Sequence, residues 1–181
     1  MQFKVIKKQN NSDMCIVCGL ESDASLKTRF YELENGFLVG ITTPLDIHQS
    51  YPNRMHGGMI TSLLDEVLGR AVQVGKGEDI WAVTGELTTK FRKPVPLNEP
   101  IKCVAKITRE NAKFYIAEGF IENEKGELLA QAKGTYFKAH IDDISEGFLS
   151  GHNWFYSPDE KSLEYIDIIN FNFFDKQKNR C

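Results

Sequence analysis

The sequence predicts an α+β fold, in which one long helix packs against an antiparallel sheet of five or six strands. Two observations lead to this prediction. A single amphipathic run with helical periodicity lies near the middle of the chain, and strand-like segments joined by short turns lie on either side of it. Strands joined by such short turns must be antiparallel, and one helix packed on such a sheet forms a layered α+β architecture.

Two strand-like segments precede the helix. Leu26–Leu33 and Phe37–Thr43 have strand character, and Glu34-Asn35-Gly36 between them has the residues of a tight turn. The next segment, Pro44–Met55, contains Pro52 and several polar residues, so we expect a loop there.

The helix is predicted from about Gly58 to Val74, where Gly75-Lys76-Gly77 stops it. At about 1.5 Å per residue it would span roughly 25 Å. Its broad apolar face comprises Ile60, Leu63, Leu64, Val67, Leu68, Ala71 and Val74. Asp65 falls on a second face made of small and partly polar residues, which another backbone or a narrow ligand could approach closely.

Four strand-like segments follow the helix, with turn signals near Glu110-Asn111 and at Glu124-Lys125-Gly126. They are Ile80–Lys93, Ile101–Arg109, Lys113–Glu122 and Glu127–His140. The first of them is closed by Pro94-Val95-Pro96, which cannot continue a sheet ladder.

Composition and charge restrict the class of protein. The chain has 181 residues, 41% of them hydrophobic and 26% charged, which is typical of one globular domain with a substantial core. The net charge of −3 argues against nucleic-acid binding. The first ten residues lack the apolar core of a signal peptide, and no stretch approaches the roughly 18 apolar residues of a membrane span. We therefore expect a cytoplasmic protein with neither nucleic acid nor membrane as a partner.

Cys15 and Cys18 have the spacing of a metal-ligand or redox pair. A zinc site needs further ligands, and His48, His56 and Cys103 lie far away in the sequence without a matching pattern. A structural or incidental role is therefore favoured, with zinc binding and redox chemistry as alternatives. The sequence predicts no metal site and no cofactor.

The start of the helix, His56-Gly57-Gly58, is the most informative motif. The two glycines let backbone N–H groups point into open space at a helix N-terminus, which carries roughly half a positive elementary charge. Such an end stabilises an anion or an oxygen that becomes one. Asp65, about two turns later, adds a carboxylate, and the two groups together could promote attack on a carbonyl. The alternatives are a solvated Asp65 and an ordinary loop histidine, and the neighbouring Glu66 fits the solvated interpretation better.

This arrangement resembles that of the hotdog-fold acyl-CoA thioesterases, most closely the phenylacetate-degradation type. The shared pattern is strands, then His-Gly-Gly, then a long helix with Asp nine residues after the His, then strands. The segment Thr84–Val95 is also similar to the family's strand after the helix, with its aromatic-basic-x-Pro end. The resemblance covers roughly Cys15 to His140 and implies a hotdog fold, with the sheet wrapped around a central helix.

The resemblance also implies roles for individual residues. The Gly57 amide would polarise the thioester carbonyl, and Asp65 would activate water or attack directly, reaching the Gly of a partner subunit. His56 would orient the thioester or assist the leaving group, and Thr84 would hold the carboxylate or the water.

The resemblance implies that Gly58, Arg92 and Lys93 bind the substrate, the last two as contacts of the CoA phosphates. The partners implied are an acyl-CoA substrate and further copies of the chain, in a homodimer or homotetramer.

Residues 1–140 would form the thioesterase domain, and residues 141–181 have no counterpart in the family. This extension is too rich in aromatic residues for disordered chain, and Ile169–Phe173 alternates as a strand would. We expect it to pack on the same domain, as an added edge strand, as a cover over the open face of the sheet, or as an oligomer contact.

Two other functions compete with thioester hydrolysis. A hydratase or dehydratase on the same fold needs a His and a carboxylate facing the β-carbon, and its motifs differ from the one found here. A non-enzymatic acyl-CoA-binding protein would gain nothing from a carboxylate near the thioester. The sequence therefore favours an acyl-CoA thioesterase that produces a free acid and CoA.

Overall fold

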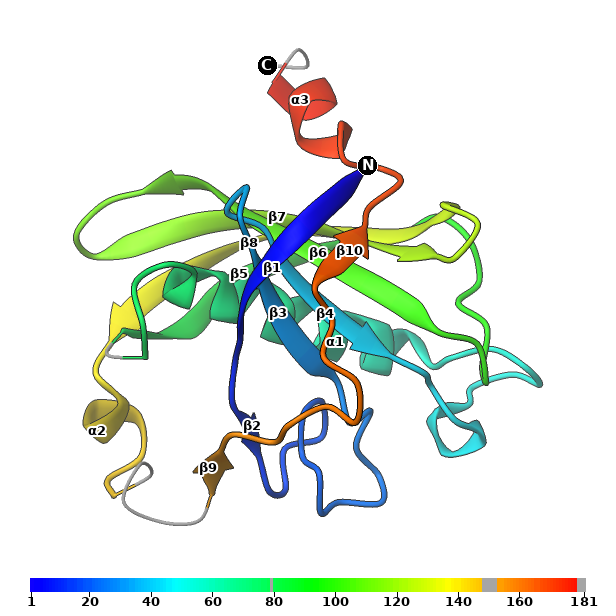
Figure 1. The fold of residues 1–181 in the computed structure, drawn as a ribbon, viewed down its shortest axis with the longest axis horizontal. Coiled ribbons are helices and arrows are strands. Elements are labelled where there is room, and N and C mark those ends of the chain that lie inside the picture. The colour runs from blue at the N-terminus through cyan, green and yellow to red at the C-terminus, as the bar shows by residue number, and fades with distance from the viewer. Residues whose placement is uncertain (79, 148–152, 179–181) are drawn as a thin grey trace.

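A computed structural model of the chain describes residues 1–78, 80–147 and 153–178, without the side chains of residues 176–178 (Figure 1). Its main element is an antiparallel sheet whose described strands follow the order β10-β1-β3-β4-β6-β7-β8-β5. These strands are β1 (Gln2–Lys8), β3 (Arg29–Leu33), β4 (Leu38–Thr42), β5 (Trp81–Phe91), β6 (Ile101–Glu110), β7 (Phe114–Asn123), β8 (Leu128–Ala139) and β10 (Tyr165–Asp167).

The remaining elements are short, apart from one helix. A separate ladder pairs β2 (Asn11–Ser12) with β9 (Trp154–Phe155). The helices are α1 (Gly57–Arg70), α2 (Ile141–Ile144) and α3 (Phe173–Lys178), with 3-10 turns η1 (Asp46–His48) and η2 (Ala71–Gln73). The predicted α+β class, one main helix on an antiparallel sheet, is confirmed.

Helix α1 matches the predicted helix in its length and in the apolar face that it buries. It continues through η2 to Gln73, after which Gly75 and Gly77 adopt positive φ angles of 71° and 82° and end it. Its buried apolar side chains pack against strands β4 to β8, which curve around it. These side chains are Ile60, Leu63, Leu64, Val67 and Leu68.

The sheet is wider than the five or six strands predicted. The strands on either side of the helix in the sequence all form, and β5 to β8 start and end within two residues of the predicted bounds. The additional strands are β1, at the N-terminus, and β10, from the C-terminal extension, which pair with each other through Phe3 and Ile166. Strand β1 then joins the sheet by pairing with β3.

The extension packs on the sheet face opposite α1, where it completes a second hydrophobic cluster. Phe173 and Phe174 lie with their ring centroids 4.7 and 5.8 Å from that of Phe120 in β7, and Phe174 lies 5.0 Å from Phe37. The strand expected at Ile169–Phe173 is wrong, because residues 169–172 form a turn and Phe173 begins α3. The alternating aromatic residues instead reach the cluster from a turn and the start of a helix.

A buried carboxylate fixes this turn to the sheet. Glu122 of β7 is fully buried and accepts hydrogen bonds from the backbone N–H groups of Ile169 and Asn170, at 3.1 and 2.9 Å. The Asn170 side chain also donates to Glu122, at 2.9 Å, and the Lys102 ammonium lies 3.3 Å from its carboxylate. The negative charge of Glu122 therefore depends on the extension for most of its partners.

Replacing Glu122 by alanine is expected to lower the free energy of unfolding by about 3 kcal/mol, because it leaves buried donors and Lys102 without their acceptor. Urea denaturation measures the change, and limited proteolysis should cut the extension faster. Glu124→Ala is the matched control, since this exposed carboxylate lies on the same hairpin. Equal stability of the two variants would show that Glu122 does not hold the extension.

Within the described residues, no helix has both the length and the apolar character needed to cross a membrane.

Candidate active site

The carboxylate of Asp65 is held by two hydroxyl groups from the sheet. Thr84 Oγ1 of β5 donates to Asp65 Oδ1 at 2.9 Å, and the Tyr136 hydroxyl of β8 donates to the same oxygen at 3.0 Å. Thr84 and Tyr136 lie opposite each other in the β5–β8 ladder, beside a register shift between Thr84 and Glu86. No residue in the described part of the chain donates to Oδ2, which leaves this oxygen available to a water molecule or a substrate.

Tyr136 is the buried part of this arrangement. Its ring stacks on that of Tyr115 with centroids 5.2 Å apart, and it packs close to Gly69 of α1, where a Cβ would lie 3.5 Å from the ring. Burial, together with the nearby charge of Asp65, raises the pKa of Tyr136 well above its usual range. Tyr136 therefore stays protonated at neutral pH and serves as a fixed hydrogen-bond donor to the carboxylate.

Asp65 lines a cavity of about 380 Å³ between α1, the start of β5 and the N-terminal loop. Its lining residues are Ser12, Cys15, Cys18, Asp65, Glu66, Gly69, Arg70, Gln73, Trp81, Ala82, Val83, Thr84 and Trp154. Trp154 belongs to β9, so the extension contributes to the wall of this Asp65 cavity. Its ring packs edge-on against Trp81, with centroids 4.8 Å apart.

A buried cation lies at the back of the cavity. Arg70 Nε donates to Glu66 Oε1 at 2.8 Å, and Nη1 donates to the Asn10 carbonyl at 2.8 Å. The guanidinium lies 4.1 Å from the Phe30 ring centroid and 4.4 Å from that of Trp154. Burial alone would lower the pKa of Arg70, but Glu66 and Cys18 raise it, so the group stays charged.

Glu66 is therefore not the solvated residue that the helical periodicity suggested. Its side chain is 26% exposed and pairs with buried Arg70. Helical periodicity places Glu66 on the surface of the helix. It cannot show that the N-terminal loop covers this part of the surface, as it does here.

The two cysteines of the N-terminal loop face Glu66. Arg70 Nη2 donates to Cys18 Sγ at 3.1 Å, and the Val17 N–H donates to Cys15 Sγ at 3.3 Å. A hydrogen bond from the Cys18 thiol, with backbone N–H groups, lowers the pKa of Cys15 to about 7 against the opposing effects of burial and Glu66. The same hydrogen bond and burial raise the pKa of Cys18. Cys15, Cys18 and Cys103 carry free thiols, and Cys181 lies outside the described residues.

The predicted motif at the start of α1 forms a separate group. His56 is the N-cap of the helix, and its Nδ1 accepts a hydrogen bond from the Gly58 N–H at 2.9 Å. The Gly57 N–H belongs to the first helical turn, where amides have no partner within the helix. A Cβ on Gly57 would lie 3.6 Å from the Phe91 ring, which is 56% exposed at the end of β5.

Arg92 and Lys93 directly follow Phe91 and are exposed. Arg92 Nε donates to Gln131 Oε1 at 3.1 Å, and Lys93 Nζ pairs with Glu127 Oε1 at 2.6 Å. Both side chains are held by weak surface contacts, so both could turn to a ligand at little cost.

The structure thus arranges the predicted site residues in two groups. Asp65 and Thr84 lie together at the cavity, whereas His56, Gly57, Gly58, Arg92 and Lys93 lie around the helix start. Gly57 and Asp65 lie eight positions apart on the helix, which is roughly 12 Å along the axis. Within one chain the Gly57 amide and the Asp65 carboxylate therefore do not face a common reacting atom.

Sequence reasoning missed three residues of the candidate site: Tyr136, which binds Asp65, and the cavity residues Arg70 and Trp154. Tyr136 alternates with Ala132 and Gly134 on the inward face of its strand, and a tyrosine buried there needs a hydrogen-bond partner. This signal could have linked it to a polar residue of the helix. Nothing in the sequence pattern connects Arg70 or Trp154 to the site, because both depend on how the termini fold back.

Comparison with known proteins agrees with this architecture. Residues 53–130, which include both groups except Tyr136 and the cavity residues of the termini, match the family model described as the thioesterase superfamily. The chain has the hotdog fold of the thioesterases. The resemblance predicted from the sequence is therefore confirmed.

Several solved structures share this hotdog fold. A thioesterase superfamily protein is 27% identical, with a TM-score of 0.62 over 68% of this chain and 59% of its own, so the present chain spans less than two thirds of that protein. The PaaI protein of the Escherichia coli phenylacetic acid degradation operon is 19% identical, with a TM-score of 0.57 over 63% of this chain and 80% of its own. A hypothetical thioesterase from Streptococcus pneumoniae, crystallised with coenzyme A, is 18% identical, with a TM-score of 0.56 over 62% and 89%. The comparison with curated proteins gives no match.

Proposed function

We propose that this hotdog protein is an acyl-CoA thioesterase, which hydrolyses the thioester to a free acid and CoA. The observation that carries the proposal is the Asp65 carboxylate, which Thr84 and Tyr136 hold through one oxygen at the edge of a cavity. The other oxygen can accept a proton from water or attack the thioester carbonyl itself. A carboxylate that is oriented in this way, with its second oxygen available, suits a general base or a nucleophile.

The second group supplies what the carboxylate lacks. The Gly57 N–H at the start of α1 would donate to the thioester oxygen as negative charge develops on it, and the helix dipole would add to this stabilisation. His56 would keep the helix start in shape through its bond to the Gly58 N–H and would stand beside the leaving sulfur. Gly58, without a side chain, would let the substrate approach.

The two groups would complete one site across a subunit interface. Strand β5 is one of the two edge strands of the described sheet. It is 11 residues long and mostly exposed, with Val83 42% and Phe91 56% exposed. A long exposed edge with apolar side chains is typically covered by another chain. We therefore propose a homodimer, alone or as half of a homotetramer, in which Asp65 of one copy faces Gly57 of the other.

The hydrolysis itself is tested with a panel of acyl-CoA esters, short and long, aliphatic and aromatic, with release of free CoA thiol as the readout. Asp65→Asn protein provides the blank, since it carries the same cysteines. Hydrolysis of at least one ester by the wild-type protein alone is the expected result. Tight binding of acyl-CoA with no turnover would instead identify a binding protein and contradict the proposal.

Arg92→Ala is expected to raise KM for acyl-CoA about 10-fold with kcat nearly unchanged, because a charge-assisted bond to a CoA phosphate lies far from the reacting carbon and contributes binding alone. Steady-state kinetics at low and high salt measure the effect, which should shrink as salt screens the charges.

Two comparisons show whether the contact is with the nucleotide. Arg109→Ala, which removes another exposed arginine of the same sheet, should leave KM unchanged. An acyl-N-acetylcysteamine thioester, which lacks the nucleotide, should show no Arg92 effect. An equal rise in KM for both substrates would mean that Arg92 acts on the fold rather than on CoA.

A further inference from the structure

The loop that carries Cys15 and Cys18 is built to hold a sulfur atom in place. The Val17 N–H points at Cys15 Sγ, 3.3 Å away, and the Gly19 N–H closes the turn on the Cys15 carbonyl at 2.7 Å. A side chain at Gly19 is impossible in this turn, because a Cβ would lie 2.5 Å from the Cys15 carbonyl oxygen. The Cys15 N–H in turn donates to Ser12 Oγ at 3.1 Å. Backbone N–H groups aimed at a sulfur stabilise it as a thiolate, the form that binds metals.

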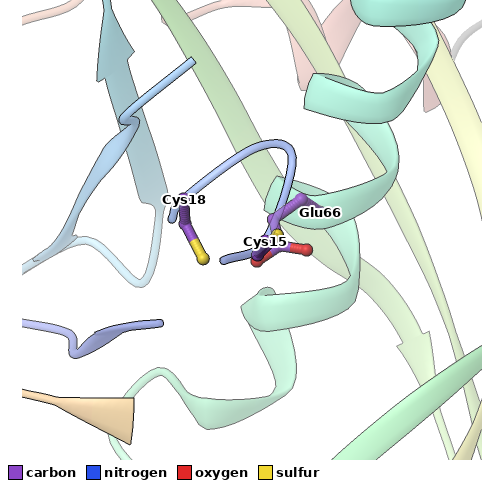
Figure 2. Close-up of side chains that lie close together, drawn as sticks. All are labelled: Cys15, Cys18 and Glu66. Carbon is purple, nitrogen blue, oxygen red and sulfur yellow. The ribbon is translucent and has the colours of Figure 1, made fainter. Parts of the chain in front are cut away.

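A third donor meets the two sulfurs. Cys15 Sγ, Cys18 Sγ and a carboxylate oxygen of Glu66 all lie within 4.8 Å of one another, the sole such group of potential metal ligands in the described part of the chain. Figure 2 shows the three side chains converging from the loop and from α1. A tetrahedral zinc ion, with bonds of about 2.3 Å to sulfur and 2.1 Å to oxygen, holds such atoms roughly 3.5 Å apart. Small side-chain movements therefore suffice to enclose an ion.

The surrounding charges suit a divalent cation. Two thiolates and the Glu66 carboxylate would carry three negative charges. Arg70 is one positive charge, which is too little to balance them in a partly buried site. Arg70, which donates to both Glu66 and Cys18, offsets one of them, and a divalent ion would offset the other two. Arg70 packs against two aromatic rings and donates to the potential ligands, and a hydrogen bond of this kind fixes the orientation of a metal ligand.

We propose that Cys15, Cys18 and Glu66 bind one soft or borderline divalent metal ion, of which Zn²⁺ is the representative. Two sulfur ligands exclude Mg²⁺ and Ca²⁺ as the preferred ions. Three protein ligands leave the fourth tetrahedral position to a water molecule or a ligand in the Asp65 cavity, which the same three residues line. The ion would also tie the N-terminal loop to α1. The proposal does not depend on thioesterase activity.

The test is a Co²⁺ titration of the reduced, metal-stripped protein, because Co²⁺ bound by thiolates shows an intense sulfur-to-metal absorption band. We expect one Co²⁺ per chain, displacement by Zn²⁺, and a higher melting temperature with Zn²⁺ than without. Cys15→Ser and Cys18→Ser should each lose most of the band. Glu66→Gln should weaken binding at least about 10-fold while the sulfur band persists at saturation, since it removes the charged oxygen ligand alone.

Cys103→Ala is the matched control, because Cys103 is buried in β6 and has no place among the three ligands. It should bind Co²⁺ as the wild type does. The proposal is overturned if the fully reduced wild-type protein shows no sulfur-to-metal band at up to millimolar Co²⁺, or if Cys103→Ala loses the band as well. It is also overturned if Cys15 and Cys18 are found joined in a disulfide that forms equally fast with Zn²⁺ present, since bound metal would protect them.

Discussion

Replacing Asp65 by asparagine is expected to lower kcat for acyl-CoA hydrolysis by about 100-fold or more, since the amide can act neither as general base nor as nucleophile. The change should leave the site intact, because the asparagine oxygen can accept the same bonds that Thr84 and Tyr136 donate to Asp65 Oδ1. KM should therefore change little, and the loss should appear in kcat and kcat/KM together.

Asp142→Asn is the control for this variant, because it makes the same chemical change at an exposed position in the first turn of α2. Its kinetics should equal those of the wild type. The melting temperatures of both variants should stay close to that of the wild type, which separates loss of chemistry from loss of fold. Turnover by Asp65→Asn within a few-fold of the wild type would refute the mechanism while leaving the hotdog fold untouched.

The central part of the fold was predictable because its signals are local. The apolar residues of α1 recur at helical spacing from Ile60 to Leu68, and glycines stop the helix at Gly75 and Gly77. Short turns such as the one at Gly126, with its φ of 74°, separate the strands that follow. Each of these features depends on a few neighbouring residues, so one sequence suffices to recognise it.

The two ends of the chain were not predictable in this way, because they depend on each other. Strand β1 pairs with β10, more than 150 residues away, through Gln2 and Asp167. The pattern at Ile169–Phe173 suggested a strand, but the buried Glu122 carboxylate binds the backbone at Ile169 and Asn170 and stabilises a turn instead. Long-range contacts of this kind leave no periodic trace in the sequence.

The same distinction applies to the candidate site. Asp65 could be singled out from the sequence because it is a carboxylate on a mostly apolar helix. The family resemblance implied that Thr84 holds the carboxylate or the water, and Thr84 donates a hydrogen bond to Asp65. Only the structure connects three further residues to the site, Tyr136, Arg70 and Trp154, since their partners include residues from other elements of the fold. The Cys15–Cys18 pair had its spacing in the sequence, but its third potential ligand, Glu66, lies on a distant helix.

The distance between Gly57 and Asp65 leads to the second large effect. If each site combines Gly57 of one copy with Asp65 of another, two variants that are inactive for different reasons should restore activity in a mixed dimer. Gly57→Pro is suited to this experiment. Proline lacks the N–H that would polarise the carbonyl, and it is favoured at the first position of a helix.

The structure accommodates this proline without strain. His56, which would precede it, already has the extended conformation that a residue before proline requires, with φ −63° and ψ 136°. A Cβ at position 57 meets the Phe91 ring at an ordinary contact distance of 3.6 Å. Gly57→Ala is the matched control, because it adds the same Cβ but keeps the N–H, and it should retain most of the activity.

Gly57→Pro and Asp65→Asn proteins should each be nearly inactive, whereas subunits of the two exchanged in one solution should recover about a quarter of wild-type activity. Random pairing in a symmetric dimer makes half of the dimers mixed, and each mixed dimer has one site with both groups intact and one with neither. Activity should rise with time as subunits exchange, and a covalently linked dimer of either variant should prevent the rise. The activity of the mixture could instead stay at the sum of the two separate variants, although exchange of labelled subunits is complete. This result would mean that Gly57 and Asp65 of different copies do not form a common site.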